Sequence, residues 1–128
     1  MPLTNQGRDE FAGALVGVAT VVFNNANSYI GVGNSSGTFA ASQTDLQGAS
    51  KTRKAMDATY PTRLGNVLTF RSTFSTSDAN YEWLEWGVFN GTSSTGSMLN
   101  RIVPANSLGV KNSSQSWQIT CTLTVNNP

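Results

Sequence analysis

The first apolar pattern along the chain predicts a short helix at residues 8–18. Apolar side chains recur there at intervals of three and four positions: Phe11, Ala14, Leu15 and Val18. This spacing puts them on one face of a helix. Gly13 and Gly17 each weaken a helix by about 1 kcal/mol relative to alanine. The valines of this region leave open a buried strand over 15–23 as the alternative.

Six later stretches have the pattern of strands, in which apolar and polar residues alternate or β-branched and aromatic residues predominate. They are 28–33, 57–63, 67–74, 81–90, 98–103 and 116–126. The last of them alternates without a break, and its apolar set is Trp117, Ile119, Cys121, Leu123 and Val125. Such alternation is typical of a half-buried strand in an antiparallel sheet.

Turn and cap residues predict how these stretches are connected. Leu64-Gly65-Asn66 predicts a hairpin turn. Pro61 lacks a backbone donor, which favours an edge position for the strand that contains it. Ser42 is a suitable helix cap, and a single helical turn over 42–47 would face Leu46 inward.

Together these elements predict a mainly β protein, an antiparallel β-sandwich of the jelly-roll type with a short N-terminal helix. The 128 residues suit one domain with a substantial core. We expect that domain over 8–128 and an N-terminal arm over 1–7. Because the arm is uncharged and rich in turn residues, we expect it to become ordered on a partner.

The chain is poor in charge and rich in hydroxyl and amide side chains. Only 12% of its residues are charged, whereas Ser, Thr and Asn number 15, 15 and 13. The net charge of +1 provides no positive field for nucleic acid. No run of about 18 apolar residues is present for a membrane span, and no secretory signal is visible. Another subunit can cover an uncharged sheet face at low desolvation cost, although the β-propensity of threonine also accounts for such a face.

The available residue types argue against catalysis. The chain has no histidine and a single cysteine, Cys121, so a thiol nucleophile would lack its usual base and most zinc and iron ligands are missing. We expect Cys121 to be a small buried hydrophobe. Asp78, Glu82 and Glu85 are the densest acidic set, but Glu82 and Glu85 would point to opposite faces of a strand and could not flank one glycosidic bond. We therefore expect no enzyme, no cofactor and no metal.

Three groups of residues are candidates for contacts. If Glu85 is buried on its aromatic strand, it needs a cationic partner, and the candidates for a structural ion pair are Arg71 and Arg101. A basic cluster would suit an acidic partner surface, although a solvated loop is the simpler interpretation; its members are Lys51, Arg53, Lys54 and Arg63. A sugar-binding platform would require exposed aromatic rings, the candidates being Tyr29, Tyr60, Tyr81 and Trp83.

Three stretches of the chain resemble a known class of proteins. They are NSYIGVG at 27–33 with TDL at 44–46, EWGVFN at 85–90 with GSMLNR at 96–101, and LGVK at 108–111 with the strand at 116–125. Together they resemble the small structural proteins of tailed bacteriophages, which include capsid decoration (cement) proteins, head fibres and tail-collar modules. The resemblance covers residues 8–125. It implies a β-sandwich, assembly into oligomers that are often trimers, and no catalytic residues.

The sequence therefore favours a bacteriophage virion structural protein, a capsid decoration protein that stabilises the assembled shell by non-covalent binding as an oligomer. We expect it to contact the major capsid protein or other virion proteins, on the capsid surface rather than the tail. It would be made in the cytoplasm of the host bacterium, with neither nucleic acid nor membrane as a partner. The alternative is a tail or head-fibre module that binds a host surface glycan through loops at 34–38 and 91–97. An enzyme such as a glycan depolymerase is a third hypothesis, and it lacks a pair of catalytic carboxylates.

Overall fold

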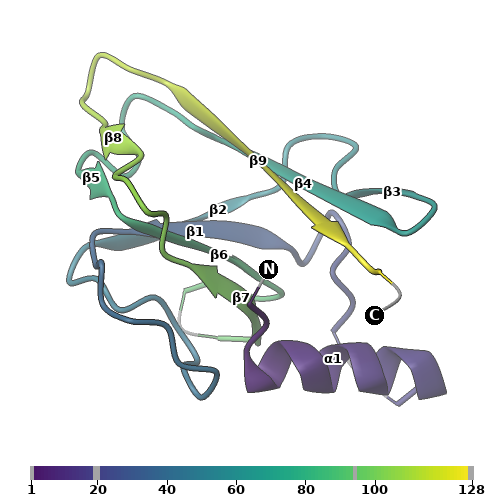
Figure 1. Cartoon of the computed structure of the whole chain (residues 1–128). Helices are drawn as coiled ribbons and strands as arrows, with labels where there is room; N and C mark the ends of the chain where they lie inside the picture. The colour runs from purple at the N-terminus through teal and green to yellow at the C-terminus, as the bar shows by residue number, and fades with distance from the viewer. Residues whose placement is uncertain (1, 19–20, 94, 127–128) are drawn as a thin grey trace.

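The computed structural model of the chain describes residues 2–18, 21–93 and 95–126. Its first element is the helix α1 (Asn5–Val16), and nine strands follow within the described residues (Figure 1). The strands are β1 (Tyr29–Gly33), β2 (Lys51–Ala55), β3 (Thr62–Leu64), β4 (Val67–Phe74), β5 (Glu82–Trp83), β6 (Glu85–Phe89), β7 (Met98–Ile102), β8 (Gly109–Val110) and β9 (Trp117–Thr124). The predicted mainly β class with one N-terminal helix is confirmed.

The strands form three open antiparallel sheets. The largest has the order β2-β1-β6-β7, the second has the order β3-β4-β9, and the third pairs β5 with β8. β4 and β9 pair along their whole length, from Val67 opposite Thr124 to Phe74 opposite Trp117. In this order β9 has one neighbour, β4, and is the last strand of its sheet within the described residues.

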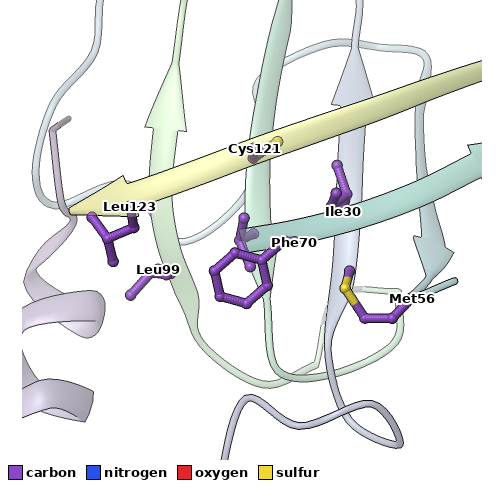
Figure 2. Packing of buried hydrophobic residues seen from close by; sticks show 7 residues of the cluster. Ile30, Met56, Phe70, Leu99, Cys121 and Leu123 are labelled. Atoms are coloured by element: carbon purple, nitrogen blue, oxygen red, sulfur yellow. The ribbon is translucent and has the colours of Figure 1, made fainter. Parts of the chain in front are cut away.

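The two larger sheets contribute to the same hydrophobic core. Ile30 from β1 and Leu99 from β7 belong to one cluster with Phe70 from β4 and with Cys121 and Leu123 from β9 (Figure 2). All five side chains are nearly or completely buried. Full burial of a large apolar side chain contributes about 1.5–3 kcal/mol, so the five side chains together stabilise the contact between the two sheets substantially.

The helix is anchored at its N-terminal end. Thr4 is the N-cap; its side chain accepts a hydrogen bond from the Gly7 N–H (2.9 Å) and donates one to the Met98 carbonyl of β7. Gly7 is buried, and a Cβ at this position would lie 2.0 Å from the Leu99 carbonyl oxygen. The absence of a side chain at Gly7 therefore allows α1 to approach β7 closely. The boundary expected between arm and domain, after residue 7, falls inside α1.

The apolar residues that predicted α1 are exposed and lie outside the buried core clusters. Leu15 is 88% exposed and Phe11 is 37% exposed. The helix ends at Gly17, whose φ of 73° is the left-handed conformation typical of a C-cap. The alternative strand over 15–23 is wrong for the described part of that stretch, because 15–16 are helical and 21–23 are irregular. Residues 19–20 lie outside the described residues.

Most strand predictions are confirmed, with ends that shift by one or two residues. The stretches at 28–33, 67–74, 98–103 and 116–126 correspond to β1, β4, β7 and β9. The predicted hairpin turn joins β3 to β4, with Gly65 at a φ of 59°. Regular alternation of apolar and polar residues therefore predicts a strand well where one face of that strand is buried.

Two predicted strands are wrong in extent. Of 57–63, only the last two residues are extended, and they begin β3, which lies at a sheet edge as Pro61 suggested. The stretch 81–90 is divided at Leu84, whose N–H donates to the Gly33 carbonyl (2.8 Å). On either side of Leu84 the pairing differs: β5 pairs with β8, whereas β6 pairs with β1 and β7, so the two strands belong to different sheets.

Two further predictions, for residues 42–47 and for β2, are wrong. The helical turn predicted over 42–47 is not formed, although Leu46 is buried as expected, with 2% exposure. A solvated loop was the simpler interpretation for the basic residues Lys51, Arg53 and Lys54. They lie instead in the strand β2, which pairs with β1 from Lys51 opposite Gly33 to Ala55 opposite Tyr29. Its charged residues gave no alternation of apolar and polar positions, which is why the pattern missed it.

Candidate interaction surface

An ion pair lies fully buried between β6 and β7. Arg101 Nε donates to Glu85 Oε1 at 2.7 Å, and both side chains have 0% exposure. Arg101 Nη1 also donates to the Gly37 carbonyl (2.9 Å) and to Gln43 Oε1 (3.2 Å). Of the two arginines proposed for Glu85, the structure places Arg101 against it, whereas Arg71 pairs with Asp57 at 2.9 Å.

The Glu85 carboxylate fastens the long connection between β1 and β2. Oε1 accepts from the Gln47 N–H (2.9 Å), and Oε2 accepts from the N–H groups of Gly48 (2.7 Å) and Ser35 (3.3 Å). Hydrogen bonds to a charged acceptor are stronger than neutral ones. One side chain thus fixes both ends of the connection, which is a structural role and leaves the carboxylate inaccessible from the surface.

The predicted basic cluster is neutralised within the chain at three of its four positions. Lys51 and Arg53 pair with Asp45 at 2.9 Å and 3.1 Å, and Lys54 pairs with Asp78 at 2.6 Å. Burial raises the pKa of Asp45, but hydrogen bonds from Lys51 and Arg53 outweigh it, so the pKa is lowered overall. These residues lie along β2, and their contact with a partner stays a prediction.

The fourth member of the cluster, Arg63, lies on β3 and donates to the Gly65 carbonyl (2.9 Å). It is exposed and lines a groove next to α1. The structure therefore separates Arg63 from the other three residues, which share β2.

Asp78 organises the turn between β4 and β5. Its carboxylate accepts from Lys54 Nζ (2.6 Å) and from the N–H (2.9 Å) and hydroxyl (2.8 Å) of Ser75. These hydrogen bonds lower the pKa of Asp78 from 3.8 to about 2. Lys111, 1% exposed, closes the same turn by donating to the carbonyls of Ser75 and Asp78 and to Asn80 Oδ1. A single Lys beside a two-residue strand offered no sequence signal for this role.

We expect Asp78→Asn to lower the free energy of unfolding by about 1 kcal/mol at pH 7, since it removes a charged acceptor at a partly exposed site. Because the folded pKa is depressed, the contribution of the carboxylate is present above about pH 4 and is lost as pH falls through about 2. Urea unfolding of wild type and Asp78→Asn at pH 7 and pH 2 measures how much the carboxylate contributes to the free energy of unfolding at each pH. Asp9→Asn, at an exposed residue without an ion pair among the described residues, is the control. An equal deficit for Asp78→Asn at both pH values would contradict the expectation.

The thiol and the aromatic side chains that the sequence offered as candidates are buried or hydrogen-bonded within the chain. Burial raises the pKa of the Cys121 thiol to about 12, so at neutral pH it is an uncharged member of the core, as expected. Trp83 is 2% exposed, and Tyr81 donates its hydroxyl to the Val32 carbonyl (3.0 Å). The four aromatic residues proposed as a sugar platform therefore do not present a common exposed face.

Of the ten large hydrophobic residues that are exposed in the described part of the chain, six lie on α1 or shortly after it. We call these six residues the apolar α1 surface: Phe11, Leu15, Val16, Val18, Val21 and Val22. Val16 is 72% exposed and Val18 is 60% exposed. The chain carries no charged residue from 11 to 44, so no charge interrupts this surface from within its own segment.

A groove borders the apolar α1 surface. It is open to solvent, has a volume of about 500 Å³ and is lined almost entirely by carbon atoms. Its lining is mainly hydrophobic and includes Phe11, Val21 and the core residue Phe70. The charged residues Glu10 and Arg63 also line it. Together with α1, the groove is a site where another apolar surface can be buried.

Within the described residues, no cluster of His, Cys, Asp and Glu side chains is suited to a metal ion, and no helix is long and apolar enough to cross a membrane. Comparison with protein-family models, with curated proteins and with solved structures gave no match.

Proposed function

We propose that this chain is a virion structural protein of a tailed bacteriophage, a capsid decoration protein that binds the assembled shell without covalent chemistry. In this proposal its two larger sheets form a β-sandwich of the jelly-roll type, and several copies act together on the capsid surface. The observation that carries the proposal is the apolar α1 surface, six exposed hydrophobic side chains gathered in one segment of the chain.

An exposed apolar area of this kind favours a protein whose work is adhesion. Six side chains exposed to this extent present on the order of 500 Å² of apolar surface, near the upper limit for monomers. One side of a standard protein interface measures about 800 Å², so the apolar α1 surface supplies more than half of one. The short helix also gains little from its own sheets, and burial of Leu15 and Val16 on a partner would stabilise it.

The assembled shell is the partner that the sequence resemblance indicates, with the major capsid protein as its chief component. A protein that binds the assembled shell but not its separated subunits stabilises the shell by mass action. The uncharged stretch from 11 to 44 favours such binding, since few ions have to be desolvated when the contact forms.

The proposal predicts that purified virions of the phage that encodes this chain contain it in hundreds of copies, measured by gel densitometry. Particles lacking it should lose DNA at a lower temperature, and adding the protein back should restore their heat resistance. A handful of copies per particle, or binding of the isolated protein to host cells and lipopolysaccharide instead of shells, would contradict decoration and favour the fibre alternative.

Leu15→Asp tests the surface itself. We expect it to weaken binding to shells at least about tenfold, because burying an unpaired carboxylate is costly, while the unfolding midpoint changes little at a residue that is 88% exposed. Leu64→Asp is the matched control, since Leu64 is 84% exposed on β3. Equal binding by both variants would exclude the apolar α1 surface from the contact.

A further inference from the structure

β9 ends the three-stranded sheet with an open edge. Eight residues of β9 pair with β4 on one side, and no other strand of the described chain pairs with them on the other. A free edge exposes a row of unpaired backbone N–H and C=O groups, which is a template for another strand.

The hydrogen-bond pattern identifies the outward-facing groups. The Val125 N–H donates to the Asn66 carbonyl on the β4 side (2.9 Å), and backbone direction alternates along an antiparallel strand. The backbone groups that point away from β4 therefore belong to Gln118, Thr120, Thr122 and Thr124. The same four residues have exposed side chains. Within the described residues, no hydrogen bond engages their outward backbone groups.

The other edges of the two larger sheets carry features that prevent pairing. β2 has three cationic side chains, and β3 has three residues that follow Pro61. The outer edge of β7 is covered by the N-terminal segment, since Leu3 bridges Asn100 and the Thr4 N–H donates to the Leu99 carbonyl (3.1 Å). Charged side chains, proline, short length and a covering segment are the means by which proteins protect sheet edges.

β9 has none of these protections. It is long, it contains no proline, and the chain carries no charge from residue 112 to its last residue. We propose that this edge is an interface between two copies of the chain, in which β9 pairs antiparallel with β9 of a second copy about a two-fold axis. The pairing specifies the self-contact of the proposed oligomeric decoration protein, and its role on the capsid rests on that function.

The second copy is the occupant because β9 is complementary to itself. In a two-fold pair centred on Cys121, Gln118 faces Thr124 of the partner copy, and Thr120 faces Thr122. All four outward-facing residues of each copy then form hydrogen-bonded pairs. Opposed threonines favour such pairing, whereas any charge near the axis would meet its own like charge from the other copy. The absence of charge over this strand thus fits a self-contact.

Sedimentation equilibrium tests the interface on the full chain. We expect the wild type to reach twice the chain mass of 13.6 kDa. In T120K/T122K, each lysine faces a lysine of the other copy, so the dissociation constant should rise at least about tenfold. T62K/L64K is the matched control, because it adds two lysines at the same spacing to the exposed edge strand β3 and should leave the constant unchanged.

Amide hydrogen exchange of the wild type gives a test that needs no variant. Concentrated samples should protect the amides of Gln118, Thr120, Thr122 and Thr124, and dilution should release these four while Ile119 and Leu123 stay protected by β4. A monomeric wild type, or a dimer that T120K/T122K leaves intact, would overturn the β9 interface.

Shell binding separates this inference from the proposed function. If the wild type is monomeric and still stabilises shells, the β9 interface is wrong and decoration stands. If β9 pairs as described but neither wild type nor variant binds shells, the interface stands and decoration is wrong. A trimer that T120K/T122K does not affect would place the self-contact elsewhere and overturn the β9 interface.

Discussion

Replacing Glu85 with alanine is expected to lower the free energy of unfolding by about 3–5 kcal/mol, the range for a buried ion pair that loses one partner. Arg101 would keep its charge in a site with 0% exposure. The N–H groups of Gln47 and Gly48 would lose their acceptor as well. The connection between β1 and β2 should therefore loosen before the rest of the molecule unfolds.

Urea unfolding of Glu85→Ala measures the decrease in the free energy of unfolding. Faster hydrogen exchange at the amides of Gln47 and Gly48 would show that the connection between β1 and β2 has loosened. Glu82→Ala is the matched control, since Glu82 is exposed on β5 and forms no ion pair among the described residues. A double variant, E85M/R101M, should recover much of the stability, because an apolar pair of similar volume avoids the cost of desolvating two ions. If Glu85→Ala lowers the free energy of unfolding no more than Glu82→Ala does, the buried ion pair does not stabilise the connection between β1 and β2.

The need of Glu85 for a cation was evident from the sequence, but its partner was not. A carboxylate among aromatic residues on a strand indicates burial, and burial demands an opposite charge. Arg71 and Arg101 were equivalent on that criterion. The choice depends on the neighbours of β6 in its sheet: β7, which carries Arg101, pairs with β6, whereas β4 belongs to the other sheet.

Other errors arose where polar contacts, rather than apolar alternation, determine the structure. β2 was missed because its charged residues give no alternation of apolar and polar positions; in the structure they pair with Asp45 and Asp78, which lie outside the strand. The stretch 81–90 was predicted as one strand because its residues are uniformly strand-forming, whereas its two parts pair with different partners, β5 with β8 and β6 with β1 and β7. Neither the strand β2 nor the division of 81–90 leaves a pattern in the local sequence. β4 and β9 each bury one face, so their alternation of apolar and polar residues predicted them.

The helix was predicted correctly from its pattern, but that pattern carries no information on what covers the apolar face. Helical spacing of apolar residues predicted α1, but such spacing indicates only that the residues share a face. In the structure that face is the apolar α1 surface, open to solvent. A segment whose apolar face finds no cover in its own chain is a candidate for contact with another molecule.

Gly7→Ala is expected to destabilise the protein by about 2 kcal/mol, although the same change in a helix interior usually stabilises by about 1 kcal/mol. The new Cβ would lie 2.0 Å from the carbonyl oxygen of Leu99 and 2.8 Å from its carbonyl carbon. Both are backbone atoms of β7, so neither can rotate away. α1 would have to tilt off the sheet and strain the cap at Thr4, whose N–H donates to the Leu99 carbonyl.

Urea unfolding gives the sign of the Gly7→Ala effect, and exchange of the Thr4 amide shows whether α1 has moved. Gly37→Ala is the matched control, because its nearest atom is the Ser35 hydroxyl at 3.2 Å, the end of a side chain that can rotate. The intrinsic preference of the helix for alanine and the crowding against β7 act in opposite directions. A stabilised Gly7→Ala would therefore mean that α1 does not approach β7 this closely, and it would remove the anchor that positions the apolar α1 surface.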